Sequence, residues 1–323
     1  MKLKQVVNLK NWHQRNIAVG YGTRDKTIIK QTKKGKVYFL AKTYDKDIGE
    51  LRSEVCASSI GRLFGFPVQK TWLCYIPQYR VFNLRHPAGV LIQLNVRRQR
   101  DTRRNQFRED LIHGASIIAL VDKSFAGLKD EKGRRKLYTL STVVKGIKNY
   151  VDKHHGSQIL WDQFFELLCF DALIGGTDRH YHNWGILEKA DSGEFIRLAP
   201  AFDNGISLMW KLQEYRTQFM RDLLIGEFPK KAESMFKKDG GGKYKLFDVI
   251  PAFYAMGDFK DSSIAKTVLD RIKSVRTSRI KTMIFKNIPK TARFQTRNEE
   301  LNLICEYAKI RLQLLKRTLS NLA

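Results

Sequence analysis

The apolar pattern of this chain changes near Arg97, and that change limits the folds available to it. Before this point, short runs rich in β-branched and aromatic residues alternate with turn residues, which is typical of strands. One helix is expected among them at 50–64, because apolar residues recur there at helical spacing and Gly65 and Pro67 follow. The strands are expected at 17–22, 27–31, 36–43, 68–76 and 89–96.

Helices predominate after Arg97. The clearest is expected at 157–174, where apolar residues recur at near-helical spacing and two glycines follow. A small β-rich half followed by a larger helical half predicts an α+β fold with two lobes, 1–95 and 96–323, in the manner of a protein kinase. Two short strands are expected at 184–188 and 195–198, and helices beyond residue 229 include 246–256, 262–274 and 299–319.

The most informative polar segment is 175–187, which reads Gly-Gly-Thr-Asp-Arg-His-Tyr-His-Asn-Trp-Gly-Ile-Leu. It places Asp178 and Asn183 five residues apart, the interval between the catalytic aspartate and the metal-binding asparagine of protein kinases. Both side chains can then point into one cleft, where the aspartate accepts a hydrogen bond from the attacking hydroxyl and the amide oxygen reaches a metal ion on the phosphates. The alternative is a turn in which the two side chains cap backbone groups.

A second acidic position lies downstream. Asp203 ends a strand-like run and is followed closely by Gly205. A carboxylate in this position suits a metal ligand, because Mg²⁺ is held by only one or two carboxylates together with the phosphates. We therefore predict Asp178 as the catalytic base, and Asn183 and Asp203 as the ligands of Mg²⁺.

Residues that could hold a nucleotide lie in the β-rich half. Lys42 ends the strand-like run Phe-Leu-Ala-Lys, and a lysine pointing inward from such a strand can hold the α- and β-phosphates of ATP if a glutamate fixes it. Glu54 in the next helix is the natural partner, and the alternative for both is an ordinary surface side chain. A glycine-containing turn could cover the phosphates with its backbone N–H groups, and it carries the predicted nucleotide-binding residues Gly20, Gly22, Thr23 and Lys26.

Taken in this order, the segments resemble the HipA-like kinases over residues 17–210. The two most specific segments are close to the family's N-x-D-R-H-x-x-N and L-x-P-x-Y-D signatures. The matching segments are Gly-Thr-Arg-Asp-Lys-Thr-Ile-Ile at 22–29, Phe-Leu-Ala-Lys at 39–42, the helix and its Gly-Phe-Pro-Val end at 53–68, Leu-Ile-Gly-Gly-Thr-Asp-Arg-His-Tyr-His-Asn at 173–183 and Leu-Ala-Pro-Ala-Phe-Asp at 198–203.

The resemblance implies a serine/threonine protein kinase that uses ATP and Mg²⁺, phosphorylates itself and acts on a bacterial or host protein, as a toxin or effector. It implies a hinge beside the adenine at 91–95, in which Gln93 replaces the usual acidic residue and Asn95 is the last residue. The family's autophosphorylated serine is not matched, because 19–21 reads Val-Gly-Tyr. The extra N-terminal subdomain of full-length HipA toxins has no counterpart ahead of these motifs, which argues against a HipB-type antitoxin partner.

Several further residues have two interpretations each. Asp171 is interpreted as a carboxylate on the surface of the apolar helix, and the alternative is a hydrogen bond to the catalytic loop. His180 and His182 suit a supporting role in the loop, because imidazole is a poor ligand for Mg²⁺. Basic clusters at 97–104 and 132–136 are interpreted as solvated faces, with docking of acidic substrates, a nuclear-localisation-like patch or nucleic-acid contact as alternatives.

The charge balance bears on partners. The chain has 59 Lys and Arg against 32 Asp and Glu, a net charge of +27, which attracts polyanions. Two alternatives therefore stay open: a phosphoinositide or small-molecule kinase at an anionic membrane, and a basic nucleic-acid-binding protein with a degenerate kinase fold. No aromatic stacking motif accompanies the basic runs, which argues against the second.

Cysteine spacing and terminal composition bear on location. The four cysteines are widely spaced, which favours neither a zinc site nor a disulfide framework. The N-terminus has no apolar core of a Sec signal, and no apolar stretch is long enough to span a membrane. We expect a cytoplasmic protein or, alternatively, one secreted without a Sec signal that acts inside host cells.

Overall fold

The structure is a computed structural model of the chain, and it describes residues 6–15, 26–32, 37–43, 48–80, 84, 87–94, 109–128, 130–154, 157–211, 228–259, 262–288 and 297–323. Its strands are β1 (Val6–Asn8), β2 (His13–Arg15), β3 (Lys26–Lys30), β4 (Phe39–Thr43), β5 (Thr71–Tyr75), β6 (Ala88–Gln93), β7 (Glu109–His113), β8 (Gly185–Lys189), β9 (Phe195–Leu198), β10 (Glu233–Lys237) and β11 (Lys243–Lys245). Its helices are α1 (Ile48–Leu63), α2 (Gly114–Ala119), α3 (Lys123–Gly127), α4 (Glu131–Leu137), α5 (Leu140–His154), α6 (Ser157–Ile174), α8 (Phe228–Lys231), α9 (Val249–Met256), α10 (Ile264–Lys273), α11 (Ser278–Asn287) and α12 (Asn298–Ser320).

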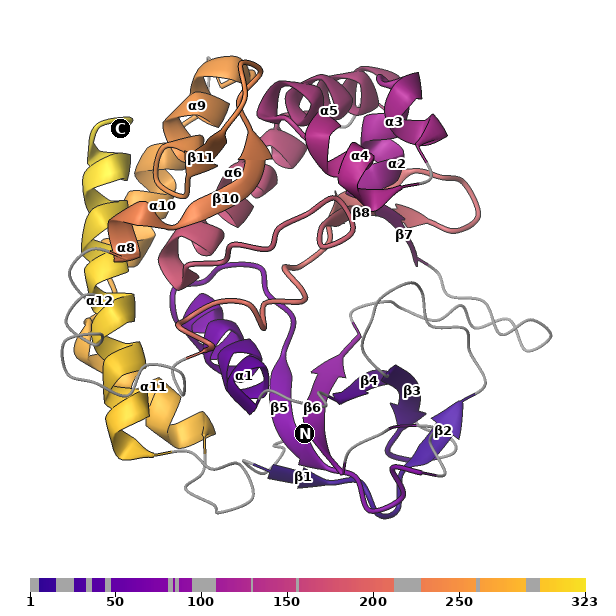
Figure 1. The fold of residues 1–323 in the computed structure, drawn as a ribbon, viewed down its shortest axis with the longest axis vertical. Helices are drawn as coiled ribbons and strands as arrows, with labels where there is room; N and C mark the ends of the chain where they lie inside the picture. Colours follow the sequence, from indigo (N-terminus) through magenta and orange to yellow (C-terminus); the bar gives the residue numbers. More distant parts are fainter. Residues whose placement is uncertain are drawn as a thin grey trace.

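The N-terminal part is built on one sheet with the strand order β1-β5-β6-β4-β3-β2 (Figure 1). β1 pairs with β5 in parallel, and the other neighbours are antiparallel. Side chains alternate between two cores, because successive residues of a strand point to opposite faces. In β6, Val90 and Ile92 belong to the main core, whereas Leu91 belongs to a smaller core with Trp12 and Phe39.

Helix α1 is buried along most of its length, and it packs against β5, β6 and α11. Residues 49–61 are all buried, and they include polar side chains that bond to the helical part of the chain. Arg52 pairs with Glu300 of α12 at 2.7 Å, and Ser59 accepts a hydrogen bond from Asn287 of α11 at 3.0 Å. These bonds allow a helix with buried polar residues to sit between the sheet and the C-terminal helices.

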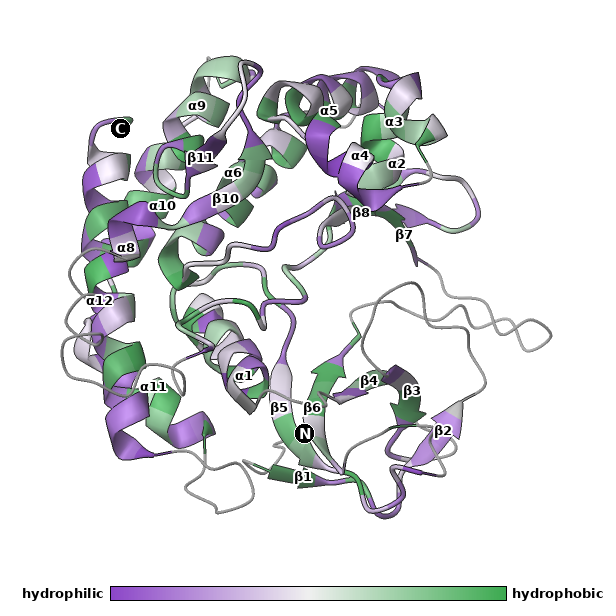
Figure 2. Ribbon diagram, in the orientation of Figure 1, coloured by the Kyte–Doolittle hydropathy of each residue, from purple (hydrophilic) through white to green (hydrophobic). Residues whose placement is uncertain are grey.

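Helix α6 is the centre of the helical part, where α5, α9, α10 and α12 pack on it. Gly175 follows it with φ of +67°, the left-handed conformation that ends helices. Figure 2 shows hydrophobic and hydrophilic bands alternating along α12. The buried residues of α12 explain this pattern, because Leu301, Ile304, Leu312 and Leu315 recur at helical spacing on the side that meets the core. Two smaller sheets, β7-β8-β9 and β10-β11, complete this part.

Most of the expected elements are confirmed. The helix at 157–174 and the strand at 195–198 have the predicted bounds, and β3, β4, β5, β6, β8, α1, α9, α10 and α12 differ from the prediction only near their ends. The elements between Glu109 and His154, the β10-β11 pair and α11 were not assigned from the sequence. The strand expected at 17–22, the lobe boundary at 95/96 and the basic cluster at 97–104 lie outside the described residues.

All four cysteines are buried and free. Among the described residues, no helix is both long and apolar enough to cross a membrane.

Candidate active site

The candidate active site lies around Lys42 and Asp203, and strand alternation determines where Lys42 points. Its neighbour Ala41 lies in the smaller core, so Lys42 points to the opposite face of the sheet, toward α1. Its Nζ lies 2.5 Å from Oδ1 of Asp203, although the two residues are 161 positions apart in the chain. The Lys42 side chain is 8% exposed and that of Asp203 is 44% exposed, so the pair lies where the interior meets solvent.

Asp203 lies on a segment that is bonded to the chain just after α1. The N–H of Ala201 donates to the carbonyl of Pro67 at 2.8 Å, and the N–H of Gln69 donates to the carbonyl of Ala201 at 3.1 Å. Asp203 itself has φ of +56°, a left-handed conformation that aspartate adopts more readily than most residues. Burial opposes its ionisation, but the charge and hydrogen bond of Lys42 outweigh burial and hold the pKa of Asp203 below its ordinary value.

Glu54, the predicted partner of Lys42, is buried on α1. Its Oε1 accepts a hydrogen bond from Nδ2 of Asn204 at 3.4 Å, and its Oε2 is buried without a hydrogen-bond partner among the described residues. Burial raises the pKa of Glu54, and the charge of Lys42 acts in the opposite direction. Glu54 therefore lies close enough to Lys42 to be affected by its charge, while Asp203 makes the direct contact.

Asp178 and Asn183 lie together in the loop that follows α6. The Asn183 Nδ2 donates to the backbone carbonyl of Asp178 at 2.8 Å, and the same carbonyl accepts from the N–H of His180 at 2.8 Å. The backbone cap that was the alternative interpretation is thus present. It uses the amide nitrogen of Asn183 and leaves the amide oxygen out of that bond, so capping and metal binding are compatible.

The carboxyl group of Asp178 is partly buried, with 31% of its side chain exposed. Burial raises the pKa of Asp178 to about 6, and the negative charge of Asp203 adds to the rise. His180 lies beside it, with Nε2 4.0 Å from Oδ2 of Asp178, and burial lowers the pKa of His180. The Nδ1 of His180 accepts from the N–H of His182 at 3.2 Å, a contact that supports the loop, as predicted.

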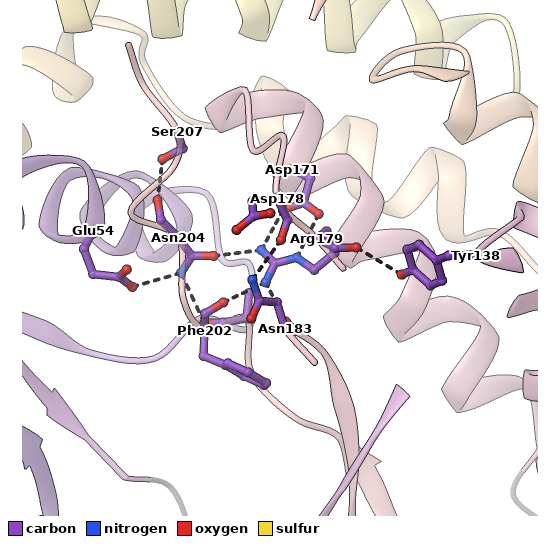
Figure 3. Close-up of polar contacts among 10 residues, drawn as sticks. Glu54, Tyr138, Asp171, Asp178, Arg179, Asn183, Phe202, Asn204 and Ser207 are labelled. Carbon is purple, nitrogen blue, oxygen red and sulfur yellow. Dashed lines mark hydrogen bonds and ion pairs between the residues drawn. The ribbon is translucent and has the colours of Figure 1, made fainter. Parts of the chain in front are cut away.

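Arg179, which the sequence analysis did not single out, is the centre of the hydrogen bonds in this loop (Figure 3). Its Nε and Nη2 bind the two carboxylate oxygens of Asp171 at 2.9 and 2.7 Å, and both side chains are buried. The interpretation of Asp171 as a helix-surface carboxylate is therefore wrong, and its alternative, a hydrogen bond to the loop that carries Asp178, is confirmed. A bidentate pair of this kind fixes orientation as well as position.

Arg179 also joins the loop that carries Asp178 to the segment that carries Asp203. Its Nη1 donates to the backbone carbonyls of Asn183 and Phe202, each at 2.7 Å. Its Nη2 donates to Oδ1 of Asn204 at 2.8 Å. Because these partners include Asn183 and both neighbours of Asp203, one buried guanidinium sets the spacing between the two predicted Mg²⁺ ligands.

The residues missed by sequence reasoning differ in how they could have been found. Arg179 directly follows Asp178 and Asn204 directly follows Asp203, so adjacency to predicted site residues was an available signal. Tyr138 lies 41 residues from Arg179, yet its hydroxyl donates to the Arg179 carbonyl at 3.0 Å (Figure 3). No local pattern marks such a tyrosine.

The other predicted nucleotide-binding residues are only partly described. Lys26 pairs with Lys42 across β3 and β4, and burial, followed by the charge of Lys42, lowers its pKa. Gln93 ends β6, and its N–H donates to the carbonyl of Lys70 at 2.9 Å. Gly20, Gly22, Thr23 and Asn95 lie outside the described residues.

A metal ion at this site would have few protein ligands. Within the described parts of the chain, no group of three or more His, Cys, Asp or Glu side chains is placed to hold a metal ion. Asp203 and the amide oxygen of Asn183 could hold one together with phosphate oxygens. That sparse, all-oxygen set suits Mg²⁺, which keeps waters and phosphates among its ligands.

Comparisons with known proteins show similarity to a kinase family and to solved kinase structures. The family profile of the HipA-like C-terminal domain matches residues 19–239. The serine/threonine-protein kinase CtkA of Helicobacter pylori strain J99 is 27% identical over 139 residues, a match that spans 41% of this chain and 41% of that protein. The crystal structure of the H. pylori proinflammatory kinase CtkA matches with a TM-score of 0.67 at 17% identity, covering 98% of this chain and 99% of that one. The HipA, HipB and operator DNA complex of Shewanella oneidensis MR-1 matches with a TM-score of 0.48 at 10% identity, over 88% of this chain and 58% of that one.

The likeness to the CtkA structure confirms the predicted α+β, two-lobed kinase-like fold class, and at this identity it speaks for the fold alone. The profile match extends from before β3 to beyond β10, so it includes Lys42, Asp178 and Asp203. The chain therefore belongs to the family of the HipA-like C-terminal domain.

Proposed function

We propose that this chain is an ATP-dependent serine/threonine protein kinase. One observation carries the proposal: Asp203 contacts Lys42 of the sheet, and its charge acts on Asp178 of the loop after α6. A phosphate-binding lysine, a base and a metal-binding carboxylate are the groups that phosphoryl transfer from ATP requires. Membership of the HipA-like family and a fold like that of a kinase support the same function.

Asp178 is the base of the proposed reaction. Burial and the charge of Asp203 raise its pKa to about 6, so the carboxylate is mostly ionised at pH 7 and still basic enough to accept a proton from a serine or threonine hydroxyl. His180 does not neutralise it, because burial keeps the pKa of this imidazole low. Arg179 holds the loop in position through its hydrogen bonds to the Asp171 carboxylate and to the backbone carbonyl of Asn183.

Asn183 and Asp203 are the proposed Mg²⁺ ligands. Lys42 lowers the pKa of Asp203, so this carboxylate is ionised, and the bond from Nδ2 of Asn183 fixes the orientation of its amide oxygen. When bound, Mg²⁺ neutralises charge that develops on the transferring phosphoryl group. Lys42 is held beside Asp203 and anchors the α- and β-phosphates, with Glu54 as the buried carboxylate that offsets its charge.

We propose that residues 1–95 form an N-terminal lobe. This lobe would bind the adenine and cover the phosphates of ATP. Gln93, at the end of β6, is the proposed hinge residue beside the adenine. Lys26 lies beside Lys42 on the neighbouring strand, which supports contact with the phosphates. Backbone groups of Gln93 and Asn95 bind the adenine in this proposal, and the turn with Gly20, Gly22 and Thr23 covers the phosphates.

The test is transfer of labelled phosphate from ATP, with Mg²⁺, to the chain itself and to serine- and threonine-containing acceptor proteins. We expect transfer by the wild type, and loss of transfer in Asp178→Ala and Asp203→Ala. Asp191→Ala is the matched control, because Asp191 is exposed in the turn between β8 and β9 and should leave transfer intact. Mass spectrometry of the chain should locate phosphoserine or phosphothreonine. Near wild-type transfer by either active-site variant would overturn the assignment.

The net charge of +27 is the reason to include two further arms. Vesicles with phosphoinositides test a lipid kinase, and labelled inositol lipid without labelled protein would replace the proposal by that function. Nucleic acid tests the remaining alternative. Binding with a steep salt dependence, in the absence of any ATP turnover, would favour a nucleic-acid-binding protein with a degenerate kinase fold.

A further inference from the structure

We propose that helix α4 is a docking surface for acidic protein segments, so that the enzyme favours serine or threonine acceptors flanked by Asp or Glu. The inference rests on the proposed kinase function and adds an acceptor class to it. It concerns the basic cluster at 132–136, for which the sequence analysis favoured a solvated face and kept docking of acidic substrates, a nuclear-localisation-like patch and nucleic-acid contact as alternatives.

α4 is fixed to the catalytic loop by the residues that flank it. Before the helix, Phe125 of α3 packs edge-on against Tyr181, with ring centroids 5.1 Å apart. Directly after the helix, Tyr138 packs against the same Tyr181 ring at 5.6 Å, and its hydroxyl donates to the carbonyl of Arg179 (Figure 3). Tyr181 and Arg179 belong to the loop that carries Asp178. The position of α4 is therefore set relative to the proposed base.

The helix presents cations to solvent. None of its residues is buried, and Lys132, Arg135 and Lys136 are exposed. Arg134 is held more firmly, because its Nε donates to the carbonyl of Leu128 at 2.7 Å. A row of exposed cations on a short, anchored helix attracts anionic groups without requiring the helix to move.

The charges of α4 act on the catalytic loop. Burial and Asp203 raise the pKa of Asp178, and Arg135 is the largest charge that acts in the opposite direction. A charge that shifts the pKa of Asp178 must lie near it. When the hydroxyl of an acceptor segment lies at Asp178, the side chains that flank this hydroxyl are therefore within reach of the cations of α4.

Charge complementarity identifies the occupant. The only acidic residue of α4 is Glu131, and it pairs with Arg135 at 2.6 Å, with side chains 64% and 48% exposed. An exposed pair of this kind contributes little stability, so a carboxylate of a docked segment can replace Glu131 beside Arg135 at little cost. A basic segment would instead meet repulsion from Lys132, Arg135 and Lys136.

The experiment compares kcat/KM of the full chain on matched peptides with one serine in a neutral background, flanked by glutamates, glutamines or lysines. We expect the wild type to favour the glutamate peptide over the glutamine peptide by roughly three- to tenfold, the effect of one or two exposed ion pairs. Arg135→Gln with Lys136→Gln should bring this ratio close to one. Lys316→Gln with Arg317→Gln removes the same charges from α12, at the opposite edge of the molecule (Figure 1), and should keep the ratio.

The ratio is the readout because a general effect of α4 on Asp178 would change kcat/KM for every peptide alike. Arg135→Glu with Lys136→Glu should reverse the preference in favour of the lysine peptide, an outcome that a damaged variant cannot produce. Equal kcat/KM of the wild type on all peptides, or a ratio that the α4 variants leave unchanged, overturns the docking surface and leaves the kinase function standing. Transfer to no peptide and no protein overturns the proposed function, and the docking surface with it.

Discussion

Replacing Arg179 with methionine tests whether the buried guanidinium holds the loop with Asp178 and Asn183 in place. The side chain makes five hydrogen bonds, at 2.7–2.9 Å, to Asp171, Asn183, Phe202 and Asn204. Methionine occupies a similar space and can donate none of them. The substitution leaves the carboxylate of Asp171, only 3% exposed, without its cation.

The expected cost follows from that uncompensated charge. Removing one partner of a buried ion pair costs about 3–5 kcal/mol in the free energy of unfolding. With about 1.5 °C of Tm for each kcal/mol in a chain of this length, Tm should fall by roughly 4–8 °C at neutral pH. Burial raises the pKa of Asp171 and Arg179 counteracts the rise, so the pKa rises further in the variant. A carboxyl group with a raised pKa costs stability above that pKa, so the loss should shrink as pH falls and Asp171 is protonated.

The assay is thermal unfolding, followed by circular dichroism at several pH values. Lys266→Gln is the matched control, because Lys266 and Asp270 also lie 2.7 Å apart but are 67% and 57% exposed. We expect this control to leave Tm unchanged, since exposed pairs contribute little. An Arg179→Met variant that unfolds within about 2 °C of the wild type at neutral pH would refute the reasoning, because a buried ion pair cannot lose one partner at so small a cost.

Three further predictions concern the carboxylates and the lysine of the site. Asp178→Asn should raise Tm at pH 8 and not at pH 3, as thermal unfolding at both pH values can test. The pKa of Asp178 in the folded chain is about 6, above the ordinary 3.8, so its ionised form lowers the stability of the folded chain. The kcat/KM of the wild type should fall as pH is lowered through about 6, as Asp178 is protonated, in a pH–rate profile. Lys42→Met should raise the pKa of Asp203 and weaken nucleotide binding, measured by calorimetric titration with ATP and Mg²⁺; unchanged affinity would contradict the phosphate-anchoring role.

The predictable part of the site is the part whose geometry is local. Asp178 and Asn183 lie in one short loop, so their spacing alone indicates that they are neighbours. Lys42 could be predicted to face α1, because a strand alternates its side chains and Ala41 is apolar. The ends of α1 and α6 were also predictable from local sequence, because a glycine shortly after a helix often ends it. Gly65 and Gly175 do so here, in left-handed conformations.

The rest depends on contacts between distant segments. Asp171 looks the same in the sequence whether it faces solvent or Arg179, because only the packing of the loop on α6 decides which. The direct contact of Lys42 with Asp203 spans 161 residues and could not be distinguished from a pair with Glu54. Helix α4 has no buried residue, so it leaves no apolar period to detect.

Helix α1 forms hydrogen bonds to the helical part of the chain next to the candidate site. Arg52 bonds to Glu300 of α12, and Ser53 donates to the carbonyl of Ser207 at 2.8 Å. Glu54, the next residue, is placed opposite Asn204 by these bonds together with the hydroxyl of Thr71 in β5, which donates to the Glu54 carbonyl at 3.3 Å.

Lys42 differs, because it belongs to β4 and reaches Asp203 from the sheet. In the proposed site, lysines of the sheet would hold the nucleotide on one side, and the Mg²⁺ ligands Asn183 and Asp203 would lie on the other. Ser53→Ala, which removes a buried bond of α1 to the Asp203 segment, should therefore disturb catalysis through Glu54 and Asn204 while the sheet keeps Lys42 in place. A lowered kcat with little change in the KM for ATP would fit this division of contacts, and a raised KM with unchanged kcat would contradict it.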